Sequence, residues 1–242
     1  MLQNIFRNMQ PVVKNLLIIN GLFFLATIVL EKQGIYLETI LGLYYVDSNA
    51  FEPYQLATHF FMHGGLGHIF FNMFGLVVFG NVLEQVWGAK RFLIFYFVTA
   101  LGAAFLYQMV QGIEIYQAAG TFFPDLDDNY KVLVNGYEYS PGNPTNNMAA
   151  INILSTRVVG ASGAIYGLLG AVAFLFPNTT VYLYFAIPIK MKWLALILGG
   201  VALLMGIQDN PGDSVAHFAH LGGMLFGLLL VKIWQKDNSR FY

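Results

Sequence analysis

The residues able to do chemistry gather in three short segments. Two of them hold every histidine of the chain: His59, His63, His68, His217 and His220. The third, residues 160–167, places Ser162 between glycines. A serine hydroxyl becomes a nucleophile when a neutral imidazole accepts its proton. The three segments therefore predict nucleophilic catalysis.

A serine–histidine dyad is the form of this chemistry that the sequence allows. Every Asp and Glu lies outside the apolar stretches or at their ends, so a buried carboxylate partner for histidine is missing. We expect Ser162 as the nucleophile and His220 as its base. His217 competes for the role of base, but only His220 is followed by glycine at the third and seventh positions. Because the base must be neutral, activity should rise from acid to neutral pH.

Two further pairs have the spacing of neighbours on one helix face. His68 and Asn72 are four residues apart and present an imidazole and an amide, which are donors suited to an oxyanion hole. Tyr166 follows Ser162 by four residues, so its ring is expected to pack against His220. Main-chain N–H groups at the helix start near Ser162 are expected to complete the donor set.

The remaining histidines and glycines favour structural roles. We expect His59 and His63 to be hydrogen-bonding groups near a membrane interface. Glycines at small-x-x-x-small spacing are expected to let two helices approach closely and so bring Ser162 to His220. These glycines are Gly163, Gly167, Gly170, Gly223 and Gly227.

No cofactor or metal is expected. The chain has no cysteine, no His-Glu-x-x-His motif and no carboxylate inside an apolar stretch, whereas zinc sites usually combine histidine with carboxylate or thiolate. A histidine-lined metal transporter and a metalloprotease are therefore weak alternatives. An intramembrane aspartyl protease fails because it needs two buried aspartates.

The composition identifies the elements that must hold these residues. Of the 242 residues, 57% are apolar and 10% are charged, and the mean hydropathy is +0.60. Soluble domains are nearer 25% charged, so the chain is predicted to be an all-α polytopic membrane protein. The net charge of −1 argues against nucleic acid as a partner. Six membrane helices are expected, at 14–31, 60–82, 91–112, 160–177, 192–208 and 214–233.

The charges predict the orientation of these helices. Nine of the 12 Lys and Arg residues fall on one side of the six-helix arrangement, whereas 11 of the 13 acids fall on the other. Because positive loops stay in the cytoplasm, both termini are expected there. The predicted organisation is a cytoplasmic tail over 1–13, a membrane domain over 14–233 with an external loop at 32–59 and an external insertion at 113–159, and a tail over 234–242. The second, fourth and sixth helices then place Ser162, His68 and His220 at a similar depth.

Three motifs in this order resemble the rhomboid family of intramembrane serine proteases. The family's His-x4-His-x3-Asn pattern matches His63, His68 and Asn72. Its Gly-x-Ser motif matches residues 160–163, and its Ala-His-x-x-Gly-x-x-x-Gly motif matches residues 219–227. The stretch 80–88 is similar to the family's junction between the second and third spans. The resemblance covers about residues 12–234.

The resemblance implies a rhomboid-like bundle and an endopeptidase that cuts the transmembrane helices of single-span membrane proteins. It implies Ser162 as nucleophile, His220 as base, His68 and Asn72 as oxyanion donors, and Tyr166 and His63 in support. The implied partners are these substrates and the lipid bilayer, and the expected location is the cell membrane of a bacterium. Two departures are a longer 113–159 insertion and no Trp-Arg pair in the first loop. The alternative is a rhomboid-fold pseudoprotease, which binds membrane clients without cutting them.

Overall fold

The computed structural model describes residues 9–119, 121–124, 132–134, 137–139, 148–183, 187–208 and 216–237. The described chain is mostly helical. Five of its helical segments are long and apolar enough to cross a membrane. They are α2 (Pro11–Glu31), the continuous run of α5 (Leu66–Gly75), η2 (Leu76–Gly80) and α6 (Asn81–Trp87), α7 (Ala89–Ala119), α10 (Met191–Gln208) and α11 (His217–Asp237).

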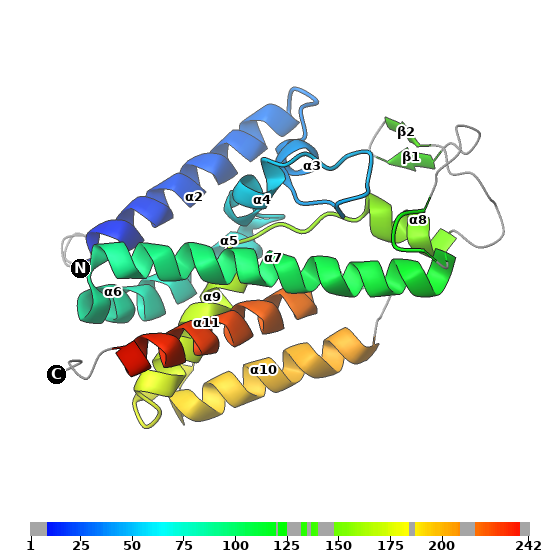
Figure 1. Ribbon diagram of the computed structural model, residues 1–242. Coiled ribbons are helices and arrows are strands. Elements are labelled where there is room, and N and C mark those ends of the chain that lie inside the picture. Colours follow the sequence, from blue (N-terminus) through cyan, green and yellow to red (C-terminus); the bar gives the residue numbers. More distant parts are fainter. Residues whose placement is uncertain are drawn as a thin grey trace.

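The helix that begins with Ser162 differs from the expectation of six full-length spans. This helix, α9, covers Ser162–Leu175 and has only 14 residues, where 160–177 was expected. It is also largely enclosed, because nine of its 14 residues are buried. α11 and α7 lie against it, and α10 and η2 contact it as well (Figure 1). A helix shielded by its neighbours need not match the full length of a lipid-exposed span.

The second span begins later and ends later than predicted. Residues 60–65 are not part of it: His59–Phe61 form the short 3-10 helix η1, and Gly65 is extended before α5 starts at Leu66. The span continues past 82 to Trp87 because Leu83 and Trp87 are buried in the core. Its middle, η2, is a π-helical segment, which adds one residue to the helical turn.

The first helix begins at Pro11 rather than at residue 14, so the predicted tail over 1–13 is partly helical. The carboxylate of Glu84 accepts hydrogen bonds from the main-chain N–H groups of Val12 and Val13, both at 2.9 Å. Asn81 accepts another from Gln10 at 2.8 Å. Glu84 therefore caps the start of α2 across the bundle, since the first N–H groups of a helix have no partner within it.

The third span was predicted to end at 112, but α7 continues to Ala119. Gly112 lies inside the helix rather than at its end, and a Cβ at this position would meet the Tyr45 hydroxyl at 2.9 Å, which accounts for the glycine. Ile115, one turn further, packs with Tyr45 and Leu154 in a small second core. The 113–159 insertion therefore begins as helix, and it also contains β1 (Val132–Val134), β2 (Tyr137–Tyr139) and α8 (Met148–Ser155). Residues 125–131, 135–136 and 140–147 of the insertion lie outside the described residues.

The other boundaries agree more closely with the prediction. α10 starts one residue early, and α11 extends to Asp237 where a tail was expected from 234. An antiparallel hairpin of β3 (Thr180–Leu183) and β4 (Ile187–Lys190) was not predicted and joins α9 to α10. Between α2 and α5, the chain forms α3 (Leu37–Leu41), α4 (Gln55–Thr58) and η1.

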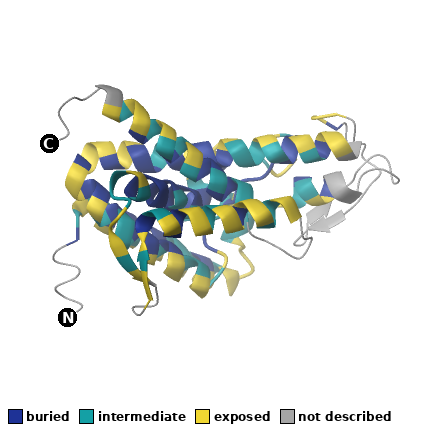
Figure 2. Ribbon diagram, turned by 90° about the horizontal axis from the view of Figure 1, so that it is seen from below, coloured by how far each residue is buried: buried dark blue, intermediate teal, exposed yellow. Residues whose placement is uncertain are grey.

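Large apolar side chains remain exposed along the outer helices, as the yellow positions in Figure 2 indicate. Leu22, Phe71 and Leu204 are each at least 60% exposed on three different helices. A water-soluble monomer rarely exposes apolar surface on this scale. Together with the five long apolar helices, this surface defines a multi-pass membrane protein.

Candidate active site

Ser162 and His220 meet between α9 and α11. His220 Nε2 lies 2.8 Å from Ser162 Oγ, which is hydrogen-bond distance. Ser162 is the first residue of α9, and His220 lies in the first turn of α11. The imidazole is buried, whereas the serine is half-buried. The expected dyad partners are therefore placed side by side although 58 residues separate them in the chain.

Glycines allow this approach, as predicted. A Cβ on Gly227 would lie 2.9 Å from the Gly167 carbonyl oxygen, and one on Gly170 would lie 3.1 Å from a Met224 side-chain carbon. A Cβ on Gly223 would overlap the main-chain atoms of Gly163. Any larger residue at these contacts would separate the two helices and with them the serine and the histidine.

Tyr166 holds the imidazole of His220 from one face. The two rings are stacked, with centroids 4.2 Å apart and planes 4° from parallel. His217 is placed differently: its ring is 6.2 Å from that of His220 and nearly perpendicular to it. The stack fixes the plane of His220, so that its Nε2 stays directed at Ser162.

His68 reaches the same place from α5. A Cβ built on Gly160 would lie 2.6 Å from His68 Nε2 and 3.7 Å from Ser162 Oγ, so both atoms border the same point. Gly160 has a φ of +118°, which favours glycine there in addition to the lack of space. The Gly64 N–H donates to His68 Nδ1 at 3.4 Å. With Nδ1 as acceptor, the neutral ring carries its proton on Nε2, the nitrogen that borders Ser162.

Asn72 lies one turn after His68 and is buried. Its Nδ2 donates to the His68 carbonyl oxygen at 2.9 Å. An amide nitrogen carries two hydrogens, so this bond fixes the side chain and leaves one donor for a ligand. Asn72 is thus oriented by the same turn of α5 that carries His68.

His63 is buried beside His68, with ring centroids 5.1 Å apart. Its Nδ1 donates to the Phe61 carbonyl at 3.3 Å, and its buried Nε2 has no hydrogen-bond partner among the described residues. His63 therefore contacts His68 rather than Ser162.

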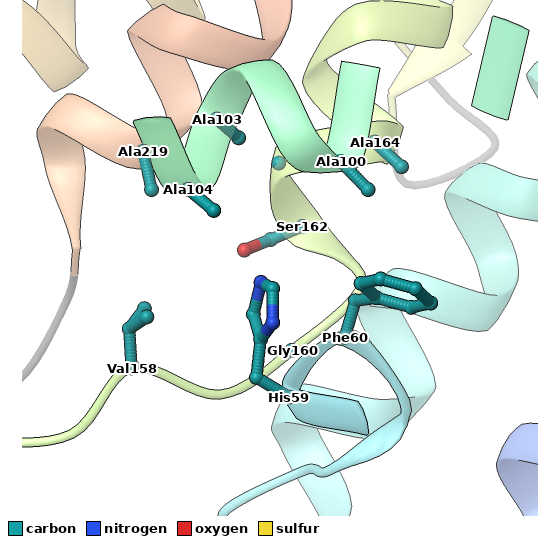
Figure 3. A pocket seen from close by; sticks show the side chains of 11 residues that line it. His59, Phe60, Ala100, Ala103, Ala104, Val158, Gly160, Ser162, Ala164 and Ala219 are labelled. Atoms are coloured by element: carbon teal, nitrogen blue, oxygen red, sulfur yellow. The ribbon is translucent and has the colours of Figure 1, made fainter. Parts of the chain in front are cut away.

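His59 is closer to Ser162 than its sequence context suggested. It lines a small cavity next to the serine, together with Ala100, Ala103, Val158 and Ala219, and its ring points toward Ser162 (Figure 3). His59 Nδ1 donates to the Gln55 carbonyl at 2.7 Å, so Nε2 is left as an acceptor. Burial lowers the pKa of His59 to about 4, and the ring is therefore neutral at pH 7.

The segment that leads into Ser162 is fixed by main-chain hydrogen bonds to the first loop. Leu43 and Val158 exchange two of them, at 2.9 and 3.0 Å, and the Gly160 N–H donates to the His59 carbonyl at 2.9 Å. Arg157 adds an ion pair with Glu38 at 3.9 Å. Ser162 is therefore held from both sides, by this extended segment and by α9.

The site brings together the groups that acyl transfer needs. They are a hydroxyl, an acceptor imidazole, an N–H donor on His68 and an amide on Asn72. Among the described residues, no group of three or more His, Asp or Glu side chains is arranged to hold a metal ion.

The fold and the site together define a multi-pass helical membrane protein with a serine–histidine pair at the start of an enclosed helix. A family model described as Rhomboid domain matches residues 50–121 and 134–236, which is well over half of the chain. The chain belongs to the rhomboid family.

Individual relatives are distant. "RHOMBOID-like protein 12, mitochondrial" of Arabidopsis thaliana is 27% identical over 232 residues, covering 96% of this chain and 61% of that protein. "RHOMBOID-like protein 6, mitochondrial" of the same plant is 28% identical over 180 residues, covering 74% and 43%. "Putative rhomboid protease YdcA" of Bacillus subtilis (strain 168) is 25% identical over 240 residues, covering 98% and 95%. The chain thus spans less than two thirds of the plant relatives and nearly all of the bacterial one.

Proposed function

We propose that this chain is an intramembrane serine endopeptidase that cleaves peptide bonds in or near the transmembrane helices of other membrane proteins. The observation that carries the proposal is the 2.8 Å contact between His220 Nε2 and Ser162 Oγ inside a helical membrane bundle. A pseudoprotease needs no such contact.

The chemistry proceeds in two halves. His220 Nε2 accepts the Ser162 proton as Oγ attacks the carbonyl carbon of the substrate, which forms a tetrahedral intermediate. Collapse of the intermediate breaks the C–N bond, and His220 gives the proton to the leaving amine. Water then attacks the acyl-serine ester, loses a proton to His220, and releases the new carboxyl end as the proton returns to Ser162.

The oxyanion is stabilised by His68 Nε2–H, the remaining amide hydrogen of Asn72 and main-chain N–H groups at the start of α9. Among the residues that the structure describes, no carboxylate bonds to His220. Tyr166, stacked on the imidazole, therefore takes over the orienting role. We expect slow turnover, which a substrate held in the same membrane tolerates.

The same proposal includes six spans with both termini in the cytoplasm, α9 being the short fourth span. The nine positive charges on one side support this orientation. Residues Asn72 and His68 then lie near the external face with Ser162. Location in the cell membrane stays a prediction, since the names of two plant relatives place them in mitochondria.

Cleavage of a single-span membrane protein in proteoliposomes tests the proposal. The purified chain should release two fragments, whereas Ser162→Ala and His220→Ala should each release none. Binding of the same substrate without cleavage by the unmodified chain would favour the pseudoprotease.

A further inference from the structure

One end of α7 carries apolar surface well past the length of a membrane span. At about 1.5 Å per residue, its 31 residues extend about 46 Å, compared with a hydrocarbon core of about 30 Å. Figure 1 shows this end projecting beyond α10 and α11, beside α8. The part near Ala119 must therefore either stand in water or lie along the membrane.

From Leu101 to Tyr116, the large apolar side chains that this helix exposes form a single row. The row repeats every three or four residues, which is one face of a helix. Its members are Leu101, Phe105, Met109, Ile113 and Tyr116, each between 47% and 58% exposed. The opposite face is buried, with Gln111 and Ile115 turned toward the protein. Nothing in the row separates a lipid-facing half from a water-facing half.

Two phenylalanines extend the row beyond the helix. Phe122 is 46% exposed and Phe123 is 64% exposed. They are held in place: the rings of Tyr116 and Phe122 stack at 4.8 Å, and the Tyr45 hydroxyl donates to the Phe122 carbonyl at 3.3 Å. We call Ile113, Tyr116, Phe122 and Phe123 the aromatic edge.

The aromatic edge differs from a typical water-exposed surface because it has almost no charged residues nearby. Between residues 101 and 124 the only charged residue is Glu114, which lies about 100° around the helix from Ile113 and so off the row. Aromatic side chains collect at the boundary between hydrocarbon and headgroups. Continuity with the lipid-facing row on the same helix identifies the occupant of this surface as lipid.

We propose that the aromatic edge lies in the bilayer, at the boundary between acyl chains and headgroups, and anchors the end of α7 there. This end supports α8 through the contact of Ile115 with Leu154, and the chain passes from α8 directly to the segment before Ser162. The inference concerns the membrane contact and does not depend on the proposed catalytic activity.

Spin labelling tests the proposal directly, because the chain has no cysteine and each introduced one is unique. Phe123→Cys is labelled with a nitroxide in vesicles of phosphatidylcholine and phosphatidylglycerol. Its accessibility to oxygen and to a water-soluble nickel complex is compared with two references. Phe105→Cys, in the middle of the apolar row, is the reference for lipid. Asn49→Cys is the reference for water: Asn49 is exposed, and it lies near the same end of α7 because its neighbour Ser48 donates a hydrogen bond to the Leu154 carbonyl.

We expect an oxygen-to-nickel accessibility ratio at Phe123→Cys at least about threefold above that of Asn49→Cys, as for a site 5–10 Å into the interface. A ratio equal to that of Asn49→Cys would overturn the proposal. So would protection from both reagents, which would mean that protein covers the edge.

A matched pair of variants tests anchoring by the rings. Phe123→Ser should raise the nickel accessibility of a label at Ile113→Cys. Leu204→Ser, at a position 63% exposed on α10, should leave it unchanged. Equal effects of the two substitutions would show that the aromatic edge anchors nothing.

Discussion

His220 and His68 reach Ser162 from two parts of the molecule that are built differently. His220 sits on α11, a regular helix whose position is set by glycine contacts with α9. His68 follows an irregular stretch in which η1, Gly64 and Gly65 precede α5, and its ring is oriented by the Gly64 main chain. The base thus depends on helix packing, whereas the donor depends on a loop. Substitutions should separate these two kinds of support.

Of the two kinds of support, the oxyanion donors are expected to show the larger effect. His68→Ala and Asn72→Ala should each lower turnover by roughly 10²–10³, the loss typical of one oxyanion donor. Substrate affinity and the melting temperature should change little. Cleavage rates measured at several substrate concentrations separate the two parameters, and unchanged turnover in the double variant would remove both residues from the mechanism.

The packing side is tested by Gly167→Ala. The added Cβ would lie 2.6 Å from Thr99 Cβ on α7 and 3.0 Å from the Gly223 carbonyl oxygen on α11. α9 must therefore shift by about 1 Å relative to both helices to restore ordinary contact. A displacement of that size at a catalytic pair costs about 100-fold in rate. Cleavage should fall accordingly, with a lower melting temperature.

Gly200→Ala is the control for this effect. Gly200 also lies in a helix, α10, but a Cβ there meets no atom within 4 Å. The variant should keep its activity and gain up to about 1 kcal/mol in stability from helix propensity. If both glycine variants behaved alike, close packing would not be what positions His220.

The two histidines of α11 should differ in importance. His220 is hydrogen-bonded to Ser162 and stacked on Tyr166, whereas the ring of His217 is 6.2 Å away from it. His217→Ala should therefore retain cleavage within about threefold, because its loss removes no group from the reaction. An inactive His217→Ala beside an active His220→Ala would reverse the assignment of the base.

His59 is expected to affect stability rather than rate. Its pKa is lowered by burial from 6.5 to about 4, so an unfolded chain binds a proton there that the folded chain does not. Stability from this group is complete above pH 6.5 and is lost as the pH falls toward 4, by up to about 3 kcal/mol. The melting temperature should fall over this range, and His59→Gln should flatten the dependence. An unaltered slope would mean that His59 is not the group that titrates.

The sequence predicted the chemical groups better than the shapes of the elements that carry them. Ser162, His220 and Tyr166 were found from motif spacing, because a helix fixes where residues four apart lie. The length of α7 was underestimated, since Gly112 resembles a helix end, whereas its contact with Tyr45 joins residues far apart in the chain. The position of His59 beside Ser162 could not be predicted, because the cavity between them forms only where alanines of α7 and α11 meet. The β3–β4 hairpin was missed because it lies in the short connection between the predicted fourth and fifth spans, where hydropathy assigns no element.

The central claim is that His220 makes Ser162 a nucleophile, and mass spectrometry after treatment with a fluorophosphonate tests it most directly. The reagent should form a covalent adduct on the peptide that contains Ser162, equally in the unmodified chain and in His217→Ala. The adduct should be absent from Ser162→Ala and strongly reduced in His220→Ala, while all four proteins keep the same melting temperature within a few degrees. An adduct that persists undiminished in a folded His220→Ala, or that forms on a residue other than Ser162, would contradict the account.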